Sequence, residues 1–179
     1  VSGASTLGGD VTTTGTQIYT GAVTVSGGDR TLTGTTIQNV STIAGGGNGL
    51  TITGNADVDG AITGVTNFVV TGASNLGANV TTTGTQNYNG AVTLSGGDRT
   101  LSGTTITTGS TLAGGGNALT ITGDVSVGGA ITGVTNFSVS GASTLGGDVT
   151  TTGAQIYTGA VTVSGGDRTL TGTTIQNVS

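Results

Sequence analysis

The chain has 179 residues and a formal net charge of −5, carried by eight Asp and three Arg. It contains no Cys, Pro, Met, Trp, His, Lys or Glu, whereas 38 residues are Gly. This composition excludes disulfide staples and thiolate metal sites, and it lacks the basic surface that nucleic-acid binding requires. No apolar run approaches the ~18 residues of a membrane span, so we expect no membrane-spanning segment.

Low hydrophobicity can indicate disorder, but disordered chains are also rich in charged residues and Pro. Only 6% of this chain is charged. Thr, Val and Ile are plentiful, and these residue types favour strands. We therefore expect an all-β fold.

The sequence is built of tandem copies at 1–69, 70–138 and, in part, 139–179. The third copy matches the first at 40 of 41 positions, and the second matches the first at 51 of 69. Periods of this kind are typical of stacked repeat architectures. We expect residues 1–179 to be one continuous segment, cut from a longer repetitive polypeptide.

Short alternating segments recur along the chain. Residues 21–25, 50–54, 68–72 and 119–123 combine apolar residues two positions apart with a Gly at one end. This period of two predicts half-buried strands, with Gly at the corners. At 68–70 the outer positions stay apolar in the next copy while Val69 becomes Ser138, so Val69 is expected to face solvent.

The Gly positions predict how the strands stack. The aligned corner positions are Gly21, Val40 (Gly109 in the second copy), Gly54, Gly72 and Gly90. The sequence interval from Val40 to Gly54 is clearly the shortest of the four. The sequence thus predicts a parallel β-solenoid (β-helix) with about four short coils of roughly 18 residues per repeat, one of them a short coil around 43–48. An alternative with three coils per repeat gives unequal coils and needs long loops. The handedness stays open.

The interior is expected to be a thin stack of aliphatic and aromatic side chains, since large apolar residues are few. The predicted core spans the first copy and the start of the second. It comprises Val23, Val25, Ile43, Leu50, Ile52, Val58, Ile62, Phe68, Val70, Leu76 and Val80, together with the residues 69 positions further on.

The segment 11–25 resembles the repeats of large bacterial exoproteins, namely filamentous-haemagglutinin-like adhesins and autotransporter-type surface proteins. The resemblance covers the whole chain and is compositional. It implies a long parallel β-helix, secretion, an extracellular or cell-surface location, and a stalk or fibre role. The family's secretion domain and adhesive tip have no counterpart here, so host or surface glycans would be bound by other parts.

The one recurring charged unit is Gly-Asp-Arg. It places Asp29 and Arg30 at equivalent positions to Asp98 and Arg99, and to Asp167 and Arg168. One interpretation is a ladder of contacts along one edge, about 19 Å apart; the favoured one is a corner stabilised by the Asp and Arg side chains. Together with Tyr19, Tyr88 and Tyr157, these residues are our candidates for turn stabilisation or contacts between subunits.

Other polar features of the sequence give weaker evidence for a functional site. Asp57 and Asp59 alternate on one strand and could share a face, but Ser126 and Gly128 replace them in the second copy. The Gly-Gly-Gly-Asn run at 45–48 lacks the helix and Lys of a phosphate loop and predicts a tight corner. We expect no catalytic residues, no cofactor and no tightly bound calcium.

The favoured function is a structural segment of a secreted or surface fibre, an adhesin stalk whose partners are other copies of itself, stacked end to end or laterally. One alternative is a Thr-array ice-binding solenoid, which the expected register disfavours because Thr-x-Thr is not held in every coil. The other is a carbohydrate-binding β-helix, for which the sequence lacks a series of aromatic platforms.

Overall fold

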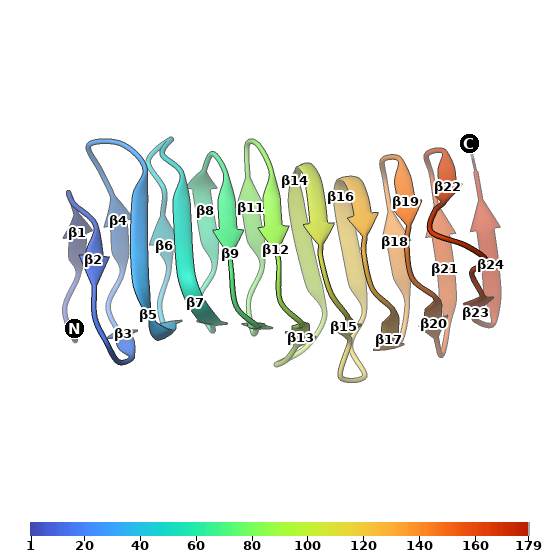
Figure 1. Cartoon of the computed structure of the whole chain (residues 1–179), viewed down its shortest axis with the longest axis horizontal. Helices are drawn as coiled ribbons and strands as arrows, with labels where there is room; N and C mark the ends of the chain where they lie inside the picture. The colour runs from blue at the N-terminus through green and yellow to red at the C-terminus, as the bar shows by residue number, and fades with distance from the viewer. Residues whose placement is uncertain (179) are drawn as a thin grey trace.

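A computed structural model of the chain describes residues 1–178 and shows a β-solenoid built of parallel strands. The coils follow one another along the long axis from the N-terminal to the C-terminal end (Figure 1). The chain makes about 9 turns, each about 19 residues long. The all-β, parallel-solenoid prediction is therefore confirmed.

The strands form three ladders, each running the length of the solenoid. The first ladder holds β1 (Ser5–Leu7), β4 (Val23–Val25), β6 (Ile43–Ala44), β8 (Ile62–Val65), β11 (Val80–Thr82), β18 (Phe137–Val139), β21 (Ala154–Tyr157) and β24 (Thr174–Asn177). The second holds β2 (Val11–Thr12), β9 (Phe68–Val70), β12 (Gln86–Tyr88), β19 (Ser143–Leu145) and β22 (Val161–Val163). The third holds β3 (Gln17–Tyr19), β10 (Ser74–Leu76), β13 (Val92–Leu94), β15 (Leu112–Ala113), β17 (Ile131–Val134), β20 (Val149–Thr151) and β23 (Leu170–Thr171).

Four longer strands cross a corner and belong to two ladders each. They are β5 (Arg30–Asn39), β7 (Leu50–Val58), β14 (Arg99–Thr108) and β16 (Leu119–Val127). In β5 the register shifts between Thr33 and Thr36, where its pairing with β7 turns the corner. Gly54 of β7 sits there at φ +133°, directly above the carbonyl oxygen of Gly34, so a Cβ would collide with backbone. Only Gly fits this stacked corner.

The core is a single column of inward side chains. All eleven predicted core residues of the first copy and the start of the second are buried, with exposed fractions of 1% or less. Phe68 and Val70 are buried while Val69 is half exposed, as the substitution to Ser138 predicts. Alternation along a strand therefore places the core correctly.

The sequence repeat and the coil are out of step. One repeat contains nine strands, of which two serve two ladders, hence eleven strand segments on three ladders, or three and two-thirds turns. Accordingly β1 lies in the first ladder, its equivalent β10 in the third, and β19 in the second. Each repeat is therefore rotated by one third of a turn relative to the one before.

This screw relation corrects the predicted register. Ser5 pairs with Val23 in the next coil, whereas Val80 pairs with Leu101, so the coil length varies along the rod. No short coil forms around 43–48, because Ile43 pairs with Val23 on one side and with Ile62 on the other. The alignment failed because equivalent Gly residues mark corners between different ladders. The tight corner at 45–48 is confirmed, with two of its Gly residues at positive φ.

Candidate functional site

The Gly-Asp-Arg unit binds backbone groups at a corner. Asp29 Oδ1 accepts a hydrogen bond from the Gly49 amide of the next coil at 2.6 Å. Arg30 folds back over its own corner, where Nη2 donates to the Ser26 carbonyl oxygen at 2.7 Å and Nη1 to that of Asp29 at 2.9 Å. Both side chains therefore stabilise the turn by forming hydrogen bonds with backbone groups around it.

The second copy of the unit repeats both contacts, and the third repeats the contact of the Arg with its own corner. Asp98 Oδ1 accepts from the Ala118 amide at 2.8 Å, and Arg99 Nη2 donates to the Ser95 carbonyl oxygen at 2.7 Å. Arg168 Nη2 donates to the carbonyl oxygen of Gly165 in its own corner at 2.9 Å. Because each repeat rotates by a third of a turn, the three units occupy three different corners. The alternative interpretation, a ladder of contacts along one edge, therefore does not describe this arrangement.

The three tyrosines are buried and cannot serve as contacts on the rod surface. Tyr88 and Tyr157 are 0% and 1% exposed, and Tyr19 is 5% exposed. Burial raises the pKa of Tyr19 and Tyr88 and raises the pKa of Tyr157 to about 12, because the ionised phenolate loses its hydration. The prediction of Tyr residues as intersubunit contacts fails because the strand alternation turns each of them inward.

Each Tyr closes a buried polar network with a Gln two positions earlier. The Tyr88 hydroxyl donates to Gln86 Oε1 at 2.9 Å, and Gln86 Nε2 donates to the carbonyl oxygens of Val80 at 3.0 Å and Ser102 at 2.8 Å. Those carbonyls belong to successive coils, so the amide ties one coil to the next. The equivalent Gln residues of the other copies repeat the arrangement. The recurring Gln-x-Tyr spacing was the available sequence signal for this network.

Most carboxylates serve the same structural purpose. Six of the eight Asp residues occupy corner positions, and five of these accept an amide from the next coil: Asp10, Asp29, Asp98, Asp124 and Asp148. Asp167, the sixth, occupies the corner equivalent to Asp29. Asn replaces Asp at some of these corners, as at Asn79, whose Oδ1 accepts the Thr100 amide at 3.0 Å. Only Asp57 and Asp59 lie outside this scheme.

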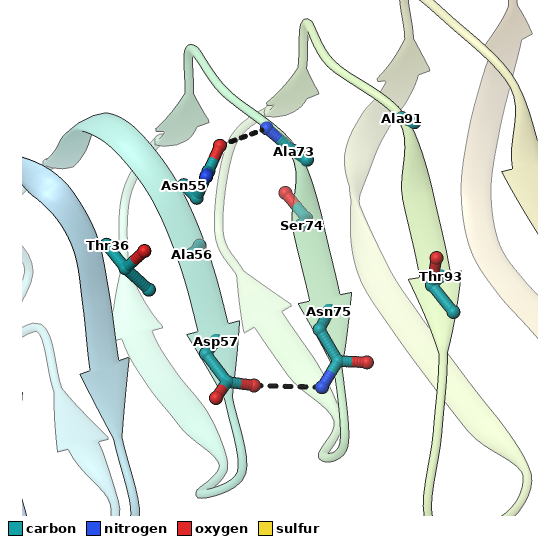
Figure 2. Close-up of a pocket in the computed structure, with 9 residues that line it drawn as sticks. All are labelled: Thr36, Asn55, Ala56, Asp57, Ala73, Ser74, Asn75, Ala91 and Thr93. Atoms are coloured by element: carbon teal, nitrogen blue, oxygen red, sulfur yellow. Dashed lines mark hydrogen bonds between the residues drawn. The ribbon is translucent and has the colours of Figure 1, made fainter.

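Asp57 lies in an open groove on the third ladder (Figure 2). The groove has a volume of about 370 Å³ and crosses β5, β7, β10 and β13. Its lining consists of Thr36, Asn55, Ala56, Asp57, Ala73, Ser74, Asn75, Ala91 and Thr93. Four of these lining residues are small, being Ala or Ser, and the others are Thr, Asn or Asp. No run of aromatic residues lines it.

The carboxylate is held between two amides. Asn75 Nδ2 donates to Asp57 Oδ1 at 2.8 Å, the bond drawn in Figure 2, and Gln38 Nε2 donates to Oδ2 at 3.0 Å. Gln38 Nε2 also reaches Asp59 Oδ2 at 3.2 Å, so the two carboxylates share a face as predicted. No sequence signal pointed to Gln38 and Asn75, since both come from other coils.

The equivalent surface one repeat further along the chain has no such set. Thr107, Ser126 and Thr144 stand there in place of Gln38, Asp57 and Asn75. Within residues 1–178 no three His, Cys, Asp or Glu side chains gather in a way that could hold a metal ion.

A row of hydroxyls, which the predicted register missed, runs along the first ladder. Its paired outward positions are Thr6, Thr24, Ala44 and Thr63, followed across a bulge by Thr81, Ser102 and Thr122. All are exposed or half exposed. Ala44 interrupts this row and Ser102 replaces Thr in it, so the Thr-x-Thr pattern is not held in every coil, as expected.

Comparison with known proteins adds no assignment: no family model, curated protein or solved structure matches the chain. Among the described residues, no helix is long and apolar enough to cross a membrane.

Proposed function

We propose that this chain is a structural segment of a secreted or cell-surface fibre, an adhesin stalk that holds another domain at a distance. The observation that carries the proposal is the use of the whole described chain for three continuous ladders joined by tight corners. Five of the eight carboxylates, the three Arg and the three Tyr secure a corner or join one coil to the next, which suits a load-bearing rod.

The screw relation makes such a rod uniform around its axis. Each repeat advances three and two-thirds turns, or about 18 Å at ~4.8 Å per coil. Three repeats return a given surface to the same ladder. In a rod built this way, equivalent surface residues of three successive repeats face three different directions. The length of the rod is set by the number of repeats.

The experiment is to measure rod length against repeat number. Proteins with two, four and six repeats, imaged by negative-stain electron microscopy, are expected to lengthen by about 18 Å per repeat at constant width. A width that grows with repeat number would reject the rod. The surface location requires a separate measurement, antibody labelling of intact source cells. Labelling that appears only after lysis would reject it.

Association of this chain with other copies of itself, end to end or laterally, belongs to the same proposal. Light scattering after size exclusion is expected to show oligomers that grow with concentration. A strict monomer at high concentration would reject association.

The hydroxyl row of the first ladder favours a second candidate function, ice binding. Within the described chain the Oγ1 atoms of Thr24, Thr81 and Thr122 make no hydrogen bond, and all three side chains are exposed. Thermal hysteresis is the test, with Thr81→Tyr as the variant that breaks the row. Hysteresis that is absent, or that survives this substitution unchanged, would reject ice binding.

A further inference from the structure

The groove around Asp57 contains one polar group that caps a backbone amide, Asn55, which accepts the Ala73 amide, and one carboxylate that caps none, Asp57. At the corners Asp side chains cap amides of the next coil, whereas Asp57 accepts only from the side chains of Gln38 and Asn75. A carboxylate offers about four acceptor positions, so two remain open toward the groove. The two amides fix its orientation from opposite sides.

The rest of the groove adds matching groups from successive coils. The Oδ1 of Asn75 and the Oγ1 of Thr93, both from the groove lining, make no hydrogen bond within residues 1–178. In Figure 2 the side chains of Asp57, Asn75 and Thr93 stand on the same face of three neighbouring strands. An extended ligand lying along the axis would meet one polar side chain from each coil, about 4.8 Å apart.

This arrangement selects the chemistry of the ligand. Two carboxylates on one face repel an anion. The open acceptors require donors, and the Thr hydroxyl can accept as well as donate. Adjacent hydroxyls of a sugar supply both functions in pairs. From this geometry we infer that the groove over β5, β7, β10 and β13 binds a neutral oligosaccharide.

The absence of aromatic platforms from the groove makes each contact weak. The affinity of the groove is therefore expected to be in the millimolar range. The inference does not rest on the stalk function, because a groove of this kind would bind sugar on a rod of any role.

The test is a nuclear magnetic resonance titration of the whole chain. Hexamers of β-1,4-linked glucose, N-acetylglucosamine and mannose are added separately, and the side-chain amide signals of Gln38 and Asn75 are followed. The matched variant combines Asp57→Ser with Asn75→Thr, the residues found at the equivalent positions one repeat further on. At least one hexamer is expected to shift both signals in the parent protein. With the variant, followed through Gln38 and the backbone amides, its affinity should fall about tenfold or more.

Three outcomes would overturn the inference. The first is that none of the three hexamers shifts the Gln38 and Asn75 signals. The second is that the variant binds as well as the parent. The third is that the shifts need calcium and that calcium alone reproduces them. The last would make the groove a cation site. None of these outcomes changes rod length per repeat, so failure here is distinct from failure of the stalk proposal.

Discussion

The two complete copies of the repeat differ from each other by one kind of substitution in the interior and by another kind on the outer surface. Inside, an apolar residue replaces an apolar one at Val25 and Leu94, Ile43 and Leu112, and Ala56 and Val125. Outside, chemistry changes outright at Ile18 and Asn87, Gln38 and Thr107, Asp57 and Ser126, and Asp59 and Gly128. Packing fixes the interior, so the outer rows are where a repeat can acquire a function of its own.

One interior pair breaks this rule. Asn39 is 3% exposed and donates to the carbonyl oxygens of Ser41 at 2.9 Å and Gly60 at 2.8 Å. Its equivalent Thr108 is also buried, but its hydroxyl has no partner within the described chain. A polar swap inside the solenoid thus leaves an unsatisfied group, a cost that the outer rows avoid because water satisfies them.

The largest expected effect sets an inward position against its outward neighbour. Phe68 is 0% exposed and packs edge to face on Tyr88, with ring centroids 6.0 Å apart. Phe68→Ala should lower the free energy of unfolding by about 3–5 kcal/mol. Val69→Ala, the control, should change it by no more than about 0.5 kcal/mol. Urea unfolding measures both, and equal losses would contradict the division into inward and outward rows.

A buried polar substitution comes next. Gln86→Leu removes the amide that joins two coils and leaves the Tyr88 hydroxyl and two backbone carbonyls without this partner. We expect a loss of about 2–3 kcal/mol, since each buried unsatisfied group is costly. Asn87→Thr, at the next position on the outside, serves as the control. A neutral Gln86→Leu would mean that the network does not lock the coils.

The same network predicts a loss of stability in alkali. Burial favours the neutral phenol, so the folded-state pKa of Tyr157 is raised to about 12 against about 10 in the unfolded chain. The stabilisation is therefore complete below about pH 10 and lost as the pH rises toward 12. The combined variant Tyr88→Phe and Tyr157→Phe should lose less stability between pH 8 and pH 11.5 than the parent. An identical loss would exclude these phenols as the cause.

The core could be predicted from the sequence because alternation depends on local chemistry alone. Phe68, Val70 and nine other buried residues were identified in this way, and Asp57 and Asp59 were placed on one face. The register could not be predicted, because the coil length varies along the rod and one repeat is not a whole number of coils. Gln38, Asp57 and Asn75 come together only through that register, so the groove could not be predicted either.

A smaller loss of stability is expected when a carboxylate is removed from a corner, and almost none when one is removed from a face of the solenoid. Asp98→Ala removes the acceptor of the Ala118 amide and should cost about 1 kcal/mol, whereas Asp98→Asn keeps an acceptor and should cost almost nothing. Asp59→Ala, on the face, is the control. Thermal unfolding of the three variants is the measurement. A loss with Asp98→Asn as large as with Asp98→Ala would show that charge, and not the hydrogen bond, matters at the corner.

The smallest effect is predicted for exchanging the outer surface of the groove for that of the equivalent strands one repeat further on. The combined variant Gln38→Thr, Asp57→Ser and Asn75→Thr should unfold within about 0.5 kcal/mol of the parent, because the chain already carries these residues on the same kind of strand. A loss above about 2 kcal/mol, which is beyond the range of ordinary surface substitutions, would instead mean that the amide–carboxylate set holds coils together as the corner Asp residues do. Its side chains would then have a structural reason to be there, and the groove would lose the feature that distinguishes it from the rest of the rod.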